Sequence, residues 1–178
     1  LKIYKEIRPL PQTEVYDKKV VCYNYNTKYE LEEIKKSNKV FFETNAYKEA
    51  KEKLEKQNIV ILHGEPWVGK TTTARKLVSD YIEQEYMFIY GNVDDLQNIK
   101  EQVAIDEKII CLLDDFLGSN VEYLEKNIAD STLDKIVGIF KNSKNKKLIF
   151  TTRTYIYNNA KNLFYKFYKS TSIKDEYL

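Results

Sequence analysis

The sequence predicts an α/β fold, a three-layer αβα sandwich in which helices cover both faces of a mostly parallel β-sheet. Four short apolar runs alternate with longer segments whose apolar residues recur at helical spacing. The runs are apolar throughout, as strands buried on both faces of a parallel sheet require. Strands that alternate with helices form βαβ units, so the strands are expected to be parallel.

Composition indicates one domain, alone or with an appendage. The 178 residues are 43% hydrophobic, which is enough for a buried core. A net charge of +2 gives no electrostatic argument for nucleic acid, a membrane surface or acidic substrates. Cys22 and Cys111 lie far apart in the sequence, which fits a reduced, cytoplasmic protein. No apolar stretch reaches about 18 residues, so no membrane span is predicted.

The N-terminal part differs from the rest of the chain. The chain starts with Leu rather than Met, and we interpret it as a fragment of a longer protein. Residues 1–40 are expected to be a linker or extension, because residues 1–19 hold two of the three prolines and show no apolar periodicity. Within it, residues 20–23 could form a short strand and residues 28–36 a charged helix. Residues 41–178 are expected to form the folded domain.

The expected elements follow the apolar pattern in order. Buried strands are predicted at residues 59–62, 87–90, 109–113 and 148–151. Helices are predicted at residues 45–57, 71–86, 94–103, 133–140 and 155–168. Asn45 is the expected N-cap of the first of these helices, and residues 141–147 are expected to be a polar turn. The last eight residues are compatible with the start of a fifth strand, at which the sheet would be truncated.

The segment after the first strand is a Walker A loop, Gly64-Glu65-Pro66-Trp67-Val68-Gly69-Lys70-Thr71. Its glycines let the backbone turn and direct N–H groups at phosphate oxygens, and the following helix adds its positive N-terminal end. Lys70 would reach the β- and γ-phosphates, and the Thr71 hydroxyl would bind Mg²⁺. The strand before it and the helix after it are the context that this motif requires. The nucleotide contacts are expected from Gly64, Glu65, Pro66, Trp67, Val68, Gly69, Lys70, Thr71 and Thr72.

Two acidic residues follow the third predicted strand. Asp114 lies where a P-loop enzyme needs a carboxylate to support Mg²⁺. Asp115 could then orient or deprotonate the attacking water. Solvated loop acids are the alternative, but the spacing of about 40 residues after a Walker loop favours the functional interpretation.

Further candidates lie at the ends of the outer strands. Arg153 follows the fourth strand at the same sheet edge and could contact the γ-phosphate; a surface charge at a helix start is the alternative. His63, the only histidine, is expected to be a packing residue, and Trp67 packs over the phosphates or covers the loop. No Asn-Lys-x-Asp guanine motif occurs, which favours adenine.

Together these motifs resemble the novel STAND NTPase 3 domain over about residues 41–165. The resemblance lies in Phe41-Phe42-Glu43-Thr44, the segment from His63 to Thr72, Asp114-Asp115-Phe116-Leu117-Gly118 and Thr151-Thr152-Arg153-Thr154-Tyr155-Ile156. The acidic box combined with the Thr-Thr-Arg-x-Tyr box is fairly specific. One departure is Trp67, where many Walker loops of these classes have Gly.

The resemblance implies an ASCE-type sheet with the Walker A strand central and an extra strand between it and the Walker B strand. It implies ATP with Mg²⁺, slow hydrolysis and nucleotide-gated self-association in the full-length protein. By position, Lys70 and Thr71 would bind phosphate and Mg²⁺, Asp114 would support Mg²⁺, Asp115 would assist water and Arg153 would be the sensor. Many bacterial members are parts of multidomain defence proteins that sense phage products. The C-terminal lid and sensor regions are expected to lie outside this chain, so the resemblance assigns it neither a sensed ligand nor an effector domain.

Three alternatives to this switch remain open from the sequence. The first is a nucleic-acid-directed AAA-like ATPase, a loader or transposition helper, for which residues 141–147 could supply a small basic patch. The second is a small-molecule kinase, although Arg153 is the one arginine expected near the phosphates. The third is a nucleotide-dependent binding module with negligible turnover, because activating residues can be supplied by another chain.

Overall fold

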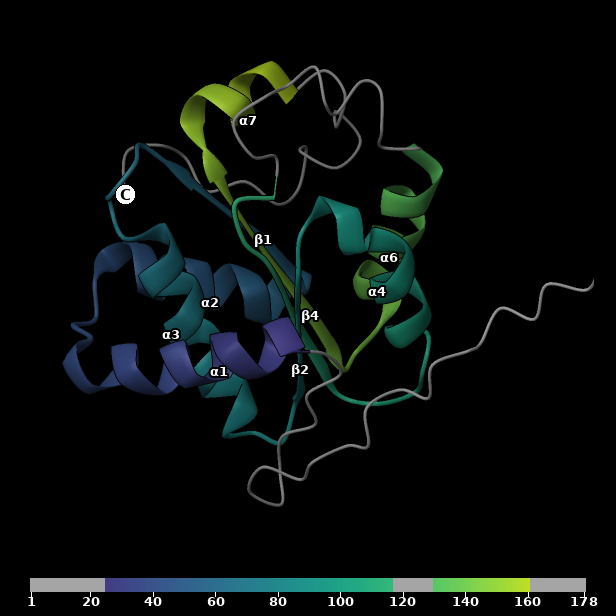
Figure 1. Ribbon diagram of the computed structural model, residues 1–178, viewed down its shortest axis with the longest axis horizontal. Helices are drawn as coiled ribbons and strands as arrows, with labels where there is room; N and C mark the ends of the chain where they lie inside the picture. Colours follow the sequence, from purple (N-terminus) through teal and green to yellow (C-terminus); the bar gives the residue numbers. More distant parts are fainter. Residues whose placement is uncertain (1–24, 117–129, 161–178) are drawn as a thin grey trace, which may run out of the picture.

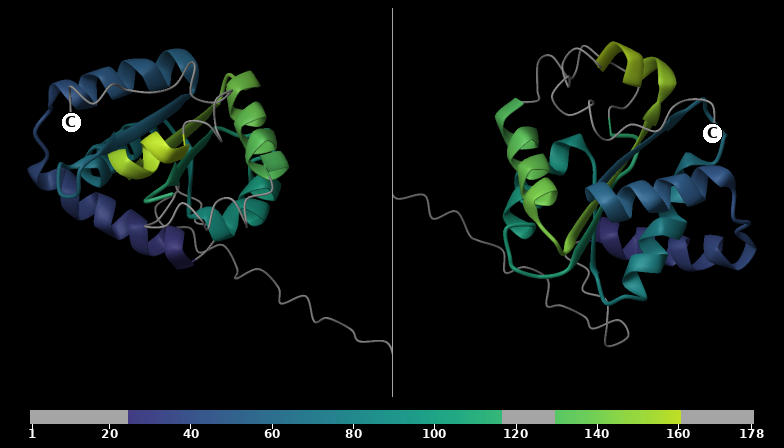
Figure 2. Two further views of the ribbon diagram at one scale, coloured as in Figure 1. Left: turned by 90° about the horizontal axis from the view of Figure 1, so that it is seen from above. Right: turned by 180° about the vertical axis from the view of Figure 1, so that it is seen from behind.

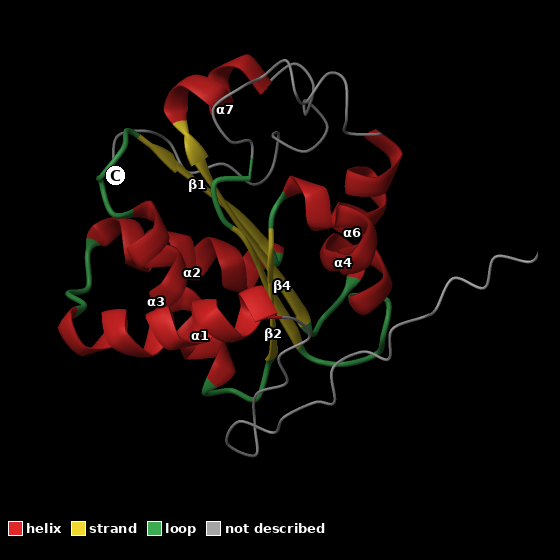
Figure 3. Ribbon diagram, in the orientation of Figure 1, coloured by secondary structure: helices red, strands yellow, loops and turns green. Residues whose placement is uncertain are grey.

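The computed structural model describes residues 25–116 and 130–160 and arranges them in three layers (Figure 1). A parallel sheet forms the middle layer. Helices α1, α2 and α3 cover one of its faces, and α4 and α6 cover the other, as the view from above makes plain (Figure 2). Strands and helices alternate along most of the chain (Figure 3). The predicted three-layer α/β class is confirmed.

In residues 25–116 and 130–160 the sheet has four parallel strands in the order β1-β4-β3-β2. These are β1 (Ile59–Gly64), β2 (Met87–Gly91), β3 (Ile109–Leu113) and β4 (Lys146–Arg153). All four predicted strands are confirmed, and β4 does lie between the Walker A strand and the strand that carries the acids. Within the described residues β1 is an edge strand, so the central position implied for the Walker A strand is not found there. The possible strands at residues 20–23 and in the last eight residues lie outside the described residues.

One face of the sheet is covered by α1 (Tyr25–Ser37), α2 (Asn45–Gln57) and α3 (Lys70–Ile82), with the short 3-10 helix η1 (Asn38–Val40) between the first two. Apolar side chains from the two later helices pack on the strands. Leu54 of α2, Leu77 of α3 and Ile149 of β4 are fully buried in this cluster. The helix α3 is therefore fixed against the centre of the sheet, with its first turn directly after the Walker loop.

The opposite face is covered by α4 (Leu96–Gln102) and α6 (Asp130–Asn142), and the 3-10 helix η2 (Val93–Asp95) leads into α4. Ile99 of α4 and Phe140 of α6 are buried against the strands. After β4 the chain continues into α7 (Thr154–Ala160), and the rest of the helix predicted to residue 168 lies outside the described residues.

Helix α1 belongs to this compact unit, although the sequence places it in an N-terminal linker. Its inward side is buried through Thr27, Glu30, Leu31 and Ile34. The helix contacts α3 and β2. The amide of Tyr90 in β2 donates a hydrogen bond to Thr27 Oγ1 at 3.2 Å. At least residues 25–37 therefore pack with the domain and do not act as a free linker.

Helix α6 (Asp130–Asn142) extends beyond the predicted residues 133–140 at both ends, and one boundary each of α2 and α3 differs as well. The N-cap of α2 is Thr44 rather than Asn45: the backbone of Thr44 is extended and its Oγ1 accepts a hydrogen bond from the Tyr47 amide at 3.2 Å. Helix α3 ends at Ile82 instead of continuing to residue 86, because the chain reverses through Glu85 with φ 68° before β2 begins. None of these changes moves the Walker loop.

The predicted polar turn at residues 141–147 is wrong at both ends, because residues 141 and 142 belong to α6 and because Lys146 and Lys147 are buried residues of β4. The Lys147 ammonium donates to the carbonyls of Leu54 and Glu55 and, at 2.7 Å, to Asn58 Oδ1. The Lys146 ammonium lies 2.6 Å from one backbone carbonyl and 3.1 Å from another in the loop before β3. Carbonyl oxygens hold both charges inside the protein, so neither lysine can contribute to a basic surface patch.

Candidate functional site

The loop between β1 and α3 has the backbone geometry of a phosphate-binding loop. Gly69 has φ 95°, and a Cβ added there would meet no atom within 4 Å, so backbone conformation rather than space requires glycine at this position. Trp67 also has positive φ, 69°. Alternation of such residues makes a concave row of N–H groups. Among the described residues, the amides of Trp67, Val68 and Gly69 donate no hydrogen bond to a backbone carbonyl, so they are available to phosphate oxygens.

Lys70 begins α3 and folds back over this loop. Its ammonium donates a hydrogen bond to the backbone carbonyl of Glu65 at 2.7 Å. Partial burial lowers the pKa of Lys70, while the nearby carboxylates of Asp115 and Asp114 oppose the shift and Arg153 adds to it. The ammonium thus lies at the loop mouth, where a phosphate oxygen could replace the carbonyl as its partner.

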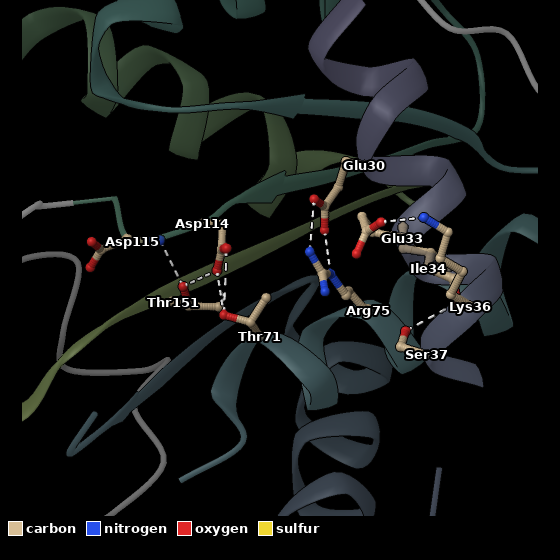
Figure 4. A network of polar contacts seen from close by, with 10 residues as sticks. All are labelled: Glu30, Glu33, Ile34, Lys36, Ser37, Thr71, Arg75, Asp114, Asp115 and Thr151. Atoms are coloured by element: carbon tan, nitrogen blue, oxygen red, sulfur yellow. Dashed lines mark hydrogen bonds and ion pairs between the residues drawn. The ribbon is translucent and has the colours of Figure 1, made fainter. Parts of the chain in front are cut away.

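Asp114 follows β3 and faces the first turn of α3. Thr71 Oγ1 donates to its carboxylate, at 3.1 Å from Oδ1 and 3.4 Å from Oδ2. Thr151 of β4 also donates a hydrogen bond to Asp114 Oδ1. Figure 4 shows the three side chains converging from a helix, a loop and a strand. The fold thus brings together the two predicted Mg²⁺ ligands, which are 43 residues apart in the sequence.

Asp115 lies beside this group in an unusual backbone conformation. Its φ is 42°, in the left-handed region. Its amide donates to Thr151 Oγ1 at 2.8 Å. The side chain is half exposed, and Arg153 Nε lies 4.0 Å from Asp115 Oδ1. Asp115 and Arg153 therefore face each other at the open side of the site.

The residues present fit Mg²⁺. Two neighbouring ligands of an octahedral Mg²⁺, each about 2.1 Å from the ion, lie about 3.0 Å apart. Thr71 Oγ1 and Asp114 Oδ1 are separated by 3.1 Å. The Thr71 hydroxyl can donate its proton to Asp114 and still offer a lone pair to the ion. No group of three or more His, Cys, Asp or Glu residues that could hold a metal exists in the described part of the chain, so phosphates and water would complete the shell.

A hollow of about 250 Å³ opens beside the Walker loop. Its lining joins residues 40–42 to the start of α3, and it includes the exposed side chains of Val40 and Phe42. Thr72 lines it from α3, and Val68 and Gly69 line it from the loop. The apolar walls and the position next to the phosphate loop suit a planar base.

The remaining sequence candidates lie at the margin of the site. Trp67 is fully exposed and covers no part of the loop, while Glu65 and Pro66 are exposed as well. His63 is buried and stacks on Tyr157 of α7, with ring centroids 3.8 Å apart and planes at 8°. This packing agrees with the structural role predicted for His63.

Two features of the site were assigned no role from the sequence. Thr151 bridges the two acidic residues, and a threonine at the end of the strand next to the acid-bearing strand is the signal that could have identified it. Arg75, one turn after Thr71 on α3, forms a two-point ion pair with Glu30 of α1: Nε lies 2.6 Å from Oε1 and Nη2 lies 3.1 Å from Oε2 (Figure 4). The hydrogen bond to Glu30 is the main cause that raises the pKa of Arg75.

The fold and this site define the class: the chain is a P-loop nucleotide-binding domain built on a parallel sheet. It belongs to the Novel STAND NTPase 3 family, whose model matches residues 41–177. The resemblance drawn from the motifs is therefore confirmed. No curated protein matches the chain.

Solved structures that align with the chain include two of DnaA. DnaA bound to AMPPCP and single-stranded DNA aligns with TM-score 0.52 and 22% identity, over 86% of this chain and 51% of that chain. AMPPCP-bound DnaA from Aquifex aeolicus aligns with TM-score 0.49 and 16% identity, over 75% of this chain and 47% of that chain. C. elegans PCH-2 aligns with TM-score 0.43 and 14% identity, over 69% and 40% of the two chains.

At 22% identity the first of these similarities shows the fold alone. The chain spans about half of the length of the two DnaA chains. None of the helices in residues 25–116 and 130–160 has the length and hydropathy that a membrane span needs.

Proposed function

We propose that this chain is the ATP-binding and ATP-hydrolysing switch domain of a larger cytoplasmic protein, and that it depends on Mg²⁺. The observation that carries the proposal is the approach of Thr71 to Asp114 at 3.1 Å, directly beside the loop over which Lys70 folds. A helix N-terminus, an ammonium, a hydroxyl and a carboxylate at one sheet edge form the set that binds a nucleoside triphosphate with its metal.

Each residue has a role in this proposal. The loop amides and Lys70 bind the β- and γ-phosphates, while Thr71 and Asp114 hold Mg²⁺, which neutralises charge on the phosphates. Asp115 orients the attacking water or accepts its proton. Arg153 is half exposed 4.0 Å from Asp115 and can turn to the γ-phosphate. ATP is favoured as the nucleotide because the guanine motif is missing and an apolar hollow lies beside the loop.

Isothermal titration with ATP, ADP and GTP in the presence of Mg²⁺ tests nucleotide binding. Lys70→Ala is expected to abolish ATP binding, because its ammonium supplies the charge at the phosphates. Lys56→Ala is the matched control, since Lys56 pairs with Glu52 on the exposed side of α2. An unchanged ATP affinity in the Lys70 variant would overturn the assignment of the site.

A phosphate-release assay tests hydrolysis. Asp115→Asn is expected to bind ATP like the parent chain and to lose turnover, because the amide is a poor proton acceptor. A variant that hydrolyses ATP at the parental rate would remove Asp115 from the mechanism.

The switch role rests on family membership. We propose that ATP holds an assembled state and ADP a closed state in the full-length protein, and that this protein acts in antiviral defence, as many bacterial STAND proteins do. Sedimentation velocity of the full-length protein with ATP or with ADP tests the first part; identical sedimentation in both would contradict it.

A second candidate is a nucleic-acid-directed ATPase. It is favoured by the fold shared with DnaA, one structure of which contains single-stranded DNA. Against it, Lys146 and Lys147 bond to carbonyls inside the protein, so residues 141–147 offer less positive surface than the sequence indicates. ATPase rates measured with and without single-stranded DNA separate the candidates: stimulation by DNA supports the second, and equal rates support the switch.

A further inference from the structure

We propose that Thr151 is a positioning residue that fixes the orientation of both acidic residues of the site, Asp114 and Asp115. The inference rests on the proposed hydrolytic function and adds to it a residue that does not itself touch the nucleotide. Its hydroxyl donates to the Asp114 carboxylate and accepts from the Asp115 amide. One hydroxyl group thereby sets the orientation of the Mg²⁺ ligand and the start of the loop that carries the water-activating residue.

The sheet places Thr151 for this task. Strands β3 and β4 are neighbours, and Leu113 pairs with Phe150 as the last pair of their register. Thr151 is therefore the next residue along β4, opposite the point where Asp114 leaves β3. Thr151 as a whole is 2% exposed, so its hydroxyl is held without competition from bulk water.

Thr151 also fixes the turn at Asp115. The φ of 42° at Asp115 lies in the left-handed region, which non-glycine residues seldom adopt although Asp does so more readily than most. Hydrogen bonds to the neighbouring backbone hold this conformation in place. The Thr151 hydroxyl accepts the Asp115 amide at 2.8 Å, and the Thr151 carbonyl accepts the Phe116 amide at 3.0 Å. Both amides on either side of the Asp115 backbone are thus bonded to the same threonine.

The hydrogen bonds that Asp114 accepts explain why its orientation matters for Mg²⁺ binding. Asp114 Oδ1 accepts from Thr71 and from Thr151 together. Carboxylates that bind metals are usually themselves hydrogen-bonded, and loss of such a partner costs about 10- to 100-fold in metal affinity or activity. Removal of the Thr151 hydroxyl would free Asp114 to rotate away from Thr71.

The neighbouring Thr152 provides a matched control. It is equally buried, at 3% exposed, but successive strand residues point to opposite faces of the sheet. Its Oγ1 has no hydrogen-bond partner among the described residues. Thr152→Val therefore removes the same group, one residue away, without touching the acids.

The experiment compares Thr151→Val, Thr151→Ser and Thr152→Val with the parent chain. Thr151→Val is expected to lower kcat and Mg²⁺ affinity in the presence of ATP by about 10- to 100-fold, with ATP affinity in EDTA unchanged. Thr151→Ser, which keeps the hydroxyl, is expected to restore both quantities to within about threefold, and Thr152→Val to leave both unchanged. Thermal unfolding followed by circular dichroism verifies that each variant is folded.

Three results would overturn the inference: parental kcat and Mg²⁺ affinity in Thr151→Val, an equal loss in Thr151→Ser, or an equal loss in Thr152→Val. A parent chain that binds Mg²⁺ with ATP but never releases phosphate would instead refute the hydrolytic function. In that case the Mg²⁺ affinities of the variants still decide whether Thr151 positions Asp114.

Discussion

The ion pair between Glu30 and Arg75 yields a prediction whose size follows from its surroundings. It joins α1 to α3 through two hydrogen bonds, of 2.6 and 3.1 Å. The Glu30 side chain is 4% exposed and the Arg75 side chain 22% exposed. We consider replacing each residue, and then both, with Met, which keeps the length of the side chain and removes the charge.

The two single replacements should differ in cost. Removing one partner of a buried ion pair costs about 3–5 kcal/mol, because the other charge is left unpaired away from water. Arg75→Met leaves the more deeply buried Glu30 carboxylate without its partner, so we expect a loss of about 3 kcal/mol in the free energy of unfolding. Glu30→Met leaves a guanidinium that keeps part of its exposure, so we expect about 2 kcal/mol. The double variant should lie within about 1 kcal/mol of the parent, since an apolar pair can replace a buried ion pair.

Urea denaturation followed by far-ultraviolet circular dichroism measures the free energy of unfolding of the parent chain, the two single variants and the double variant. Fluorescence is a poorer probe, because the single tryptophan, Trp67, is fully exposed. The pair Glu33–Lys36 on the same helix is the control: its atoms are 2.8 Å apart, but the lysine side chain is 69% exposed, and its coupling should be too small to measure. Equal coupling in the two cycles, or a greater cost for the Glu30 variant, would refute the argument that burial sets the strength.

Three further predictions concern packing and pH. Gly91→Ala should destabilise the protein by about 1–3 kcal/mol, because the new Cβ would lie 2.7 Å from Ile99 Cδ1, and a smaller residue at position 99 should reduce the loss. Gly138→Ala is the control, since its Cβ would meet no atom within 4 Å and should not destabilise the protein. Equal shifts of the melting temperature in the two variants would contradict this contrast. Lys147→Met should cost about 1–3 kcal/mol by urea denaturation, because it removes the donor of Glu55 O and Asn58 Oδ1, while Leu54 O still accepts from the Asn58 amide. A more stable variant would show that the burial cost of the ammonium dominates. Burial raises the pKa of Tyr47 from 10 to about 12, so the phenol's contribution to stability is complete below pH 10 and is lost as the pH rises through 12. Tyr47→Phe should therefore lose less stability than the parent chain over that range. Parallel curves of stability against pH for the two proteins would contradict this prediction.

The fold was predictable because its determinants are local. Each strand is a run of apolar residues that needs burial on both faces, and each helix between them has one apolar side. The Walker loop and the acids were predictable for a related reason. In a parallel sheet all strands end at one edge, so motifs that follow strands must meet there, as Thr71 and Asp114 do.

What could not be predicted depends on contacts between distant segments. Lys146 and Lys147 have the composition of a polar turn, and only the carbonyls contributed by other segments allow them inside the sheet. The end of α3 is similar: residues 83–86 are compatible with a helix, and the chain reverses at Glu85 because β2 must pair with β3. The linking role of Thr151 follows from the strand order, which composition does not reveal.

Helix α1 shows how such contacts define the domain itself. The family model begins at residue 41, whereas the described packing begins with α1 at Tyr25. In the described part of the chain β2 is an edge strand, and the Thr27 hydroxyl of α1 accepts a hydrogen bond from the Tyr90 amide of β2. Edge strands with open backbone groups are liable to pair with other chains, and a covering helix prevents this. Glu30 of α1 also forms an ion pair with Arg75, which lies on α3 one turn after Thr71. A displacement of α1 would therefore pull on α3, the helix that begins directly after the nucleotide loop.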